Sequence, residues 1–134
     1  MSVHDETVRI LENSKINGAY SKLVFKSLPL AKKVKPGQFV NIQIEQSLVP
    51  FLRRPFSYFR VRGQRIEILY EVLGEGTALL ARKQPGDTLK ILGPLGNAFS
   101  AAKVKKKRVL VAGGCGVPPL VFFAEQNFAD YLLI

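Results

Sequence analysis

Five consecutive residues, Arg53-Arg54-Pro55-Phe56-Ser57, bring together side chains suited to a phosphorylated aromatic ligand. An arginine just before a strand can hold a phosphate with two hydrogen bonds. Pro55 fixes φ and removes one backbone donor, so the entry into the strand is stiff. Phe56 offers a ring to a flat heteroaromatic group, and Ser57, facing the other way, offers one hydroxyl. A plain strand with a surface arginine and a core phenylalanine would show the same pattern.

A glycine-rich segment, Leu73-Gly74-Glu75-Gly76-Thr77, leads into a run of good helix formers that ends before Pro85. Glycines let the backbone approach an anion closely, and the N–H groups and dipole of a helix N-terminus attract it. Thr77 would cap the helix or donate to a phosphate oxygen. With Arg54, this segment predicts a diphosphate held at the helix end and a ring system along residues 56–58. A strand-to-helix turn that only needs glycine is the alternative.

A second glycine turn, Gly113-Gly114-Cys115-Gly116, follows the apolar run at residues 109–112. A helix is predicted over residues 117–126, with its prolines in the first turn. This strand, turn and helix arrangement is typical of the first unit of a nucleotide-binding sheet. The third glycine of the G-x-G-x-x-G pattern is replaced by Pro119. A tight connection without a ligand is the alternative here.

The elements that must position these segments are short strands with tight turns between them. Alternating apolar residues and turn signals predict strands at residues 7–11, 20–26, 38–45, 56–61, 66–72 and 88–92. One helix, at residues 77–83, interrupts them. Such a series is typical of an antiparallel barrel or sandwich. A basic segment at residues 103–108 then marks a boundary between a domain at residues 1–102 and a shorter unit at residues 103–134.

Composition narrows the class of protein. The chain has 134 residues, 47% of them hydrophobic, which suits one globular domain or slightly more. The acidic N-terminus and the shortness of the apolar runs predict a cytoplasmic protein without a membrane span. The formal net charge of +10 would attract nucleic acid, an anionic lipid face or a phosphate-bearing cofactor. Nucleic acid is disfavoured, because aromatic residues do not alternate with the basic residues at 103–108.

Taken in order, the motifs resemble the ferredoxin–NADP reductase-like superfamily, and most closely the electron-transfer subunits of class 1B dihydroorotate dehydrogenases. Small subunits of NADH-dependent ferredoxin:NADP reductases and of sulfide dehydrogenases share much of the pattern. The resembling segments are Pro36-Gly37-Gln38-Phe39-Val40, Arg54-Pro55-Phe56-Ser57, Leu73-Gly74-Glu75-Gly76-Thr77, Gly93-Pro94-Leu95-Gly96-Asn97, and residues 112–120.

The resemblance implies a mainly β fold: a six-stranded antiparallel Greek-key barrel that binds FAD, followed by the first βα unit of an incomplete α/β nucleotide-binding domain. Arg54 would hold the FAD diphosphate, and Phe56 would pack on the isoalloxazine. Gly93-Pro94-Leu95-Gly96 would support the flavin site. The implied FAD contacts are Arg54, Pro55, Phe56, Ser57, Tyr58 (through its backbone), Leu73, Gly74, Gly76 and Thr77; the implied NAD contacts are Gly113, Gly114, Gly116 and Val117.

The implied function is to pass electrons from NADH through FAD towards a 2Fe–2S centre and the catalytic subunit of a dihydroorotate dehydrogenase, in pyrimidine biosynthesis. No acid–base residue and no metal ligand is predicted. Members of the family run to about twice this length and carry four cluster cysteines, whereas Cys115 is the single cysteine here. The chain therefore resembles a truncated member, in which turnover of NADH is an open question.

Two alternatives remain at this point: a flavin-binding module without independent activity, or another electron-transfer subunit of the same superfamily. A single βα unit cannot bury both of its faces. The apolar segment at residues 109–134 is therefore expected to pack on the barrel, to pair with a second copy of the chain, or to be poorly ordered.

Overall fold

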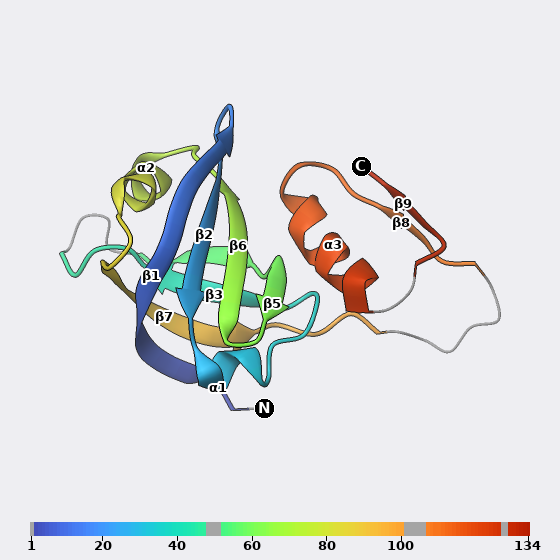
Figure 1. The fold of residues 1–134 in the computed structure, drawn as a ribbon, viewed down its shortest axis with the longest axis horizontal. Coiled ribbons are helices and arrows are strands. Elements are labelled where there is room, and N and C mark those ends of the chain that lie inside the picture. Colours follow the sequence, from blue (N-terminus) through green and yellow to red (C-terminus); the bar gives the residue numbers. More distant parts are fainter. Residues whose placement is uncertain (1, 48–51, 101–106, 127–128) are drawn as a thin grey trace.

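The computed structural model describes residues 2–47, 52–100, 107–126 and 129–134. Most of it is a curled antiparallel sheet with the strand order β4-β3-β7-β1-β2-β6-β5 (Figure 1). Its strands are β1 (His4–Asn17), β2 (Tyr20–Lys26), β3 (Phe39–Gln43), β4 (Arg54–Ser57), β5 (Arg60–Arg62), β6 (Arg65–Glu71) and β7 (Thr88–Leu95). Helices α1 (Leu28–Ala31) and α2 (Glu75–Arg82) lie in its connections.

The alternating pattern places one face of each strand in a common core. In β6, Ile66, Ile68 and Tyr70 are buried, whereas the residues between them are partly exposed. The buried side chains from neighbouring strands form one cluster that includes Leu23, Phe25, Val40, Ile42, Leu89 and Ile91. This is the arrangement expected for an antiparallel sheet that is apolar on one side. The mainly β fold predicted from the sequence is confirmed.

Strands β4 and β5 follow each other in the chain but occupy opposite edges of the curled sheet. Residues 58 and 59 cross from one edge to the other. The Tyr58 N–H donates to the Gln38 carbonyl at 3.4 Å, and the Phe59 N–H donates to the Glu67 carbonyl at 2.9 Å. The prediction of one strand over residues 56–61 was therefore wrong, and the sheet has seven strands where six were expected.

Beside the curled sheet lies a smaller βα unit. It consists of β8 (Val109–Val111), the 3₁₀ turn η1 (Gly114–Gly116), α3 (Val117–Gln126) and β9 (Tyr131–Leu133), with β8 and β9 parallel. Helix α3 lies next to β5, and Phe122 joins the core cluster of the large sheet (Figure 1). Of the three arrangements expected for this segment, the structure shows packing on the barrel for the described residues.

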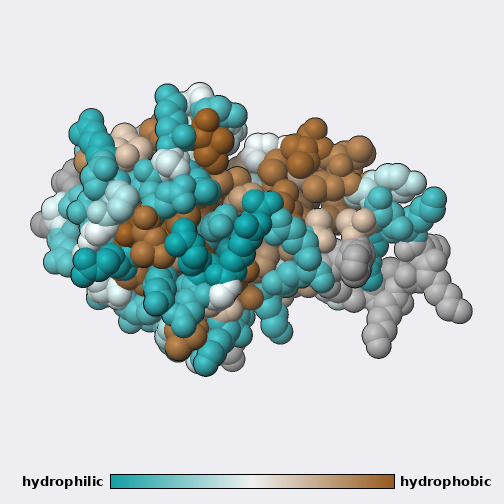
Figure 2. All heavy atoms as spheres, viewed as in Figure 1, coloured by the Kyte–Doolittle hydropathy of each residue, from teal (hydrophilic) through white to brown (hydrophobic). Residues whose placement is uncertain are grey.

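The opposite face of the small sheet is uncovered. Val109, Val111, Tyr131 and Leu133 each leave more than half of their surface exposed. Apolar residues gather over this part of the molecule (Figure 2). Residues 103–106 of the predicted basic connector lie outside the described residues. Among the described residues, no helix is long and apolar enough to cross a membrane.

Candidate functional site

A pocket of about 470 Å³ lies between β4, β6, the start of α2 and the turn before α3. Four of its lining residues, Arg54 to Ser57, come from the first segment singled out in the sequence. Leu73 and Thr77 come from the second segment. The other lining residues are Gly37, Phe39, Leu69, Tyr70, Glu71, Cys115 and Pro118. The fold thus brings the first two predicted segments to one pocket.

Arg54 lies directly against the N-terminal turn of α2. Gly76 is buried there, and a Cβ atom added to it would stand 2.9 Å from Nε and 3.2 Å from Cζ of Arg54. Only glycine therefore allows the guanidinium to lie at this position. Arg54 Nη1 donates to the Leu52 carbonyl. No salt bridge joins Arg54 to a carboxylate within the described ranges, so its charge stays available to an anion.

Helix α2 begins at Glu75, two residues before the predicted start at Thr77. The Thr77 hydroxyl oxygen accepts hydrogen bonds from the N–H groups of Leu73 at 2.9 Å and Gly74 at 3.1 Å. Of the two roles considered for Thr77, the structure therefore shows the cap. The N–H groups of Glu75, Gly76 and Thr77 have no acceptor within the helix, as in the first turn of any α-helix. They and the helix dipole make this end attractive to an anion.

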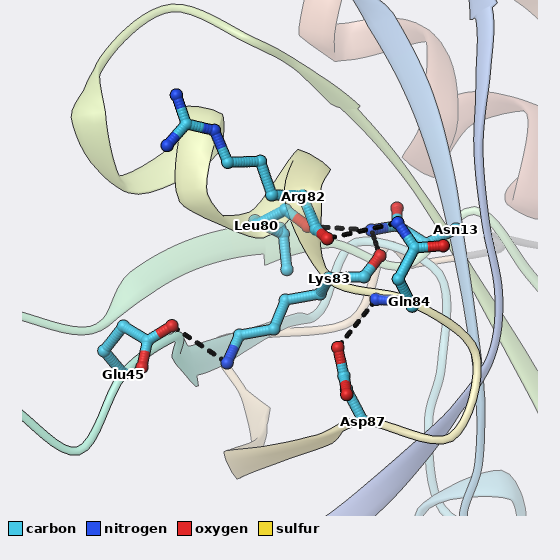
Figure 3. Close-up of polar contacts among 7 residues, drawn as sticks. All are labelled: Asn13, Glu45, Leu80, Arg82, Lys83, Gln84 and Asp87. Atoms are coloured by element: carbon cyan, nitrogen blue, oxygen red, sulfur yellow. Dashed lines mark hydrogen bonds and ion pairs between the residues drawn. The ribbon is translucent and has the colours of Figure 1, made fainter.

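The other end of α2 is fixed by Asn13 of β1 (Figure 3). Asn13 Nδ2 donates to the carbonyls of Leu80 at 2.7 Å and Lys83 at 2.9 Å. Its Oδ1 accepts from the Tyr70 hydroxyl at 2.8 Å. The Tyr70 ring meets Phe56 edge-on, with centroids 5.9 Å apart. One chain of contacts therefore links the helix to the aromatic wall of the pocket.

The side chains of residues 56–58, at and just after the end of β4, lie in different places. Phe56 lies in the pocket wall with 9% of its surface exposed, and Ser57 is partly buried beside it. Tyr58 points into the core and does not line the pocket. Burial, and secondarily the charge of Glu6, raise the pKa of the Tyr58 hydroxyl. This hydroxyl has no hydrogen-bond partner among the described residues. A ligand contact from the Tyr58 backbone stays a prediction.

The second glycine turn reaches the pocket through residues other than its glycines. Cys115 and Pro118 line the pocket, whereas Gly113, Gly114 and Gly116 do not. A Cβ atom added to any of these glycines would meet no atom within 4 Å. Gly114 has a φ of +54°, a conformation that favours glycine. The presence of this glycine is therefore explained without a bound ligand. The described residues form no close-fitting cradle at this turn, and the role of Val117 in binding NAD is likewise a prediction.

Sequence reasoning missed several residues of the pocket wall. Leu69 and Glu71 alternate with the core residues of β6, so they could be placed on its outer face but not beside β4. Phe39 is supported by Gly96, whose added Cβ would stand 3.0 Å from the Phe39 ring. The predicted supporting segment at residues 93–96 therefore does not line the pocket itself but contacts Phe39, which does. The shared pocket wall follows from strand order, for which the sequence offers no local signal.

Comparison with solved structures defines the class of this protein. The fold is similar to the NADH-dependent reduced ferredoxin–NADP oxidoreductase, with a TM-score of 0.83 and 25% identity over 93% of this chain and 47% of that one. The chain therefore has the ferredoxin reductase-like fold. No protein-family model matches the chain.

Curated sequences that are similar to the chain include electron transfer subunits of dihydroorotate dehydrogenase B (NAD⁺). The electron transfer subunit of dihydroorotate dehydrogenase B (NAD⁺) from Geobacillus kaustophilus is 50% identical over 97 residues, which are 69% of this chain and 37% of that protein. The corresponding subunit from Caldanaerobacter subterraneus is 39% identical over 127 residues, 94% of this chain and 49% of that protein. The chain is therefore homologous to these subunits and spans less than half of their length.

Proposed function

We propose that the chain binds FAD in the pocket between β4, β6 and α2, as the flavin-holding part of an electron transfer subunit of dihydroorotate dehydrogenase B. The observation that carries this proposal is the contact of Arg54 with Gly76. Two positive features, a guanidinium and the N-terminus of a helix, face each other there with no side chain between them. An anion between them would turn this repulsion into attraction.

A diphosphate fits these two features better than a single phosphate does. One phosphoryl group would accept the two parallel N–H bonds of the Arg54 guanidinium. The other would accept the N–H groups at the start of α2. Gly76 allows the close approach because a Cβ atom would occupy the space next to Arg54. This arrangement favours FAD over FMN, which has only one phosphate.

The rest of the pocket suits a large ring. Its apolar wall is formed by Phe39, Phe56, Leu69 and Tyr70, and Ser57 adds a polar residue to the lining. Apolar walls with a few polar groups are typical of cofactor sites. A bound flavin supplies hydride acceptance and stepwise release of electrons. The protein residues bind and orient the ring and shield it from water, so the proposal needs no acid–base residue.

The relatives bear on the source and the destination of the electrons. They are named as NAD⁺-linked electron transfer subunits of dihydroorotate dehydrogenase B. By homology, electrons would pass from NADH through FAD to an iron–sulfur centre and the catalytic subunit, in cytoplasmic pyrimidine biosynthesis. The chain has one cysteine, so at least three of the four thiolate ligands would have to come from another segment or chain. Residues 1–102 would form the flavin domain and residues 103–134 the start of the nucleotide domain.

A second candidate is a flavin-binding module that does not itself oxidise NADH. The open surroundings of Gly113, Gly114 and Gly116 favour it, because a Cβ atom added to any of them would meet no atom of the described residues within 4 Å. In this case flavin binding would be complete, whereas nicotinamide binding would need additional protein segments. The two candidates share the same FAD site and differ in turnover alone.

The test is an absorbance spectrum of the purified protein, followed by release and identification of any bound cofactor and titration with FAD and FMN. We expect FAD to bind more tightly than FMN, and Arg54→Ala to remove most of this preference. Folded protein that takes up no FAD would refute the proposal. NADH-dependent reduction of a dye by the FAD-loaded protein separates the two candidates.

A further inference from the structure

Helix α3 and the turn before it form one continuous helical rod, whose two ends meet different parts of the barrel. Gly114, with a φ of +54°, opens η1 and is not part of this rod. Cys115 and Gly116 continue directly into α3, since Val117 has helical dihedral angles (φ −62°, ψ −50°). Cys115 and Pro118, near the N-terminal end, line the pocket. Glu125, near the other end, lies about 15 Å further along at 1.5 Å per residue. A displacement at one end of such a rod is transmitted to the other.

The distal end of the rod is held by an ion pair with β5. Glu125 Oε1 accepts a hydrogen bond from Arg60 Nε at 2.6 Å and lies 2.5 Å from Arg60 Nη2 in the ion pair. The guanidinium of Arg60 also stacks 4.3 Å above the ring of Phe59. This stacking orients the guanidinium before the carboxylate arrives, so less rotational freedom is lost when the pair forms. Helix α3 lies along β5 (Figure 1).

The middle of the rod is held by apolar contacts. Phe122 and Phe123 are buried, and Phe123 meets Phe99 edge-on at 5.8 Å between centroids. Phe99 in turn lies against Gly37, where an added Cβ would stand 2.9 Å from its ring, and Gly37 lines the pocket. Apolar packing favours association but is non-directional. It therefore attaches the helix without fixing how far it slides or rolls.

We propose that Arg60 and Glu125 are positioning residues for the flavin pocket: their ion pair sets the register of the η1–α3 rod on the barrel and so keeps Cys115 and Pro118 in the pocket wall. Directional charge pairs fix the register of an interface more than they add to its affinity. The flavin-related part of this inference rests on the proposed function. The attachment of the rod does not, because it follows from contacts of the protein alone.

The test begins without flavin. Hydrogen exchange of residues 114–126 is compared between the parent protein and Glu125→Ala. We expect the exchange rate to rise roughly two- to five-fold in the variant, the range of an exposed ion pair. Exchanging the charges, with Arg60→Glu and Glu125→Arg combined, should restore a large part of the protection.

Glu12→Ala is the matched control. Glu12 pairs with Lys22 at 3.0 Å, and the side-chain exposures of 37% and 30% resemble the 40% and 28% of Glu125 and Arg60. This pair joins β1 to β2, away from α3. The control should not change the hydrogen exchange of residues 114–126. It also measures what the loss of any exposed ion pair does to the protein.

The second stage measures the dissociation constant for FAD. Glu125→Ala should raise it by a factor similar to the rise in exchange, the charge exchange should recover part of the loss, and Glu12→Ala should have no effect. Unchanged exchange in Glu125→Ala would overturn the attachment. Faster exchange with parent affinity for FAD would overturn the positioning role. If the parent protein takes up no FAD, the proposed function fails, and the exchange data alone decide the attachment.

Discussion

Substitution of Gly76 by alanine should separate flavin affinity from protein stability. The added methyl group would stand 2.9 Å from Nε of Arg54, closer than two such atoms can remain. Arg54 is a flexible, partly exposed side chain, so it can move away at little cost to the fold. Gly76 does not have a positive φ, so alanine suits its backbone conformation. The fold should therefore accept the change, and the anion site should not.

Gly76→Ala should change protein stability and FAD affinity in opposite directions. Alanine in place of glycine within a helix stabilises it by up to about 1 kcal/mol. Displacing Arg54 removes a charge-assisted hydrogen bond to the diphosphate, which contributes about 1.5–3 kcal/mol. This loss corresponds to a rise of roughly 10- to 150-fold in the dissociation constant for FAD. We expect Gly76→Ala to unfold at equal or higher denaturant concentration and to bind FAD much more weakly.

The measurement is a fluorescence titration with FAD beside a urea unfolding curve. Ala81→Gly is the control, because it makes the opposite change on an exposed position of the same helix that does not line the pocket. It should lower stability by roughly 0.5–1 kcal/mol and leave FAD affinity unchanged. Parent affinity in Gly76→Ala would refute the assignment of the diphosphate to Arg54 and α2.

Three other predictions concern polar groups that are buried or partly buried. Tyr58→Phe should raise stability by about 1 kcal/mol in urea unfolding, because the hydroxyl is buried without a described partner; a loss of stability would mean that the hydroxyl is bonded. Burial raises the pKa of both Tyr58 and Tyr70, so the native state retains these protons above the pKa of about 10 of an unfolded tyrosine. The part of the stability that depends on these two tyrosines should therefore be constant below about pH 10 and fall as the pH rises towards the folded-state values, so the alkaline fall should be less steep in Tyr58→Phe; an equally steep fall in the parent protein and in Tyr58→Phe would contradict this. Asn13→Ala should cost about 2–3 kcal/mol and weaken FAD binding several-fold, because the carbonyls of Leu80 and Lys83 lose their donor; parent affinity in this variant would show that α2 needs no anchor.

Local patterns were sufficient to predict most strands. Alternation in residues 66–72 and 20–26 follows from a sheet with one buried face, which is a property of each strand by itself. The helix at residues 117–126 was also predictable, because prolines are tolerated in a first helical turn. These features depend on residues close together in the chain, so the sequence contains the information directly.

Features set by long-range pairing could not be predicted in this way. Residues 56–61 alternate like one strand, but the chain leaves β4 at Ser57 and joins the opposite edge of the sheet at Arg60. The break lies at Tyr58 and Phe59, which are both buried, so the alternation of buried and exposed residues is interrupted there. Only the positions of Gln38 and Glu67, whose carbonyls accept the two N–H groups, show where the strand ends.

The two glycine turns illustrate the same limit at the functional site. Gly76 and Gly114 both lie where a strand gives way to a helix, and both predicted an anion site from the sequence. Gly76 is buried against a guanidinium that arrives from β4, twenty-two positions earlier in the chain. Gly114 has a positive φ and open space around it, so backbone conformation alone accounts for it. What distinguishes a binding turn from a structural one is therefore the charged group opposite the helix end, and the order of the strands decides whether one is present.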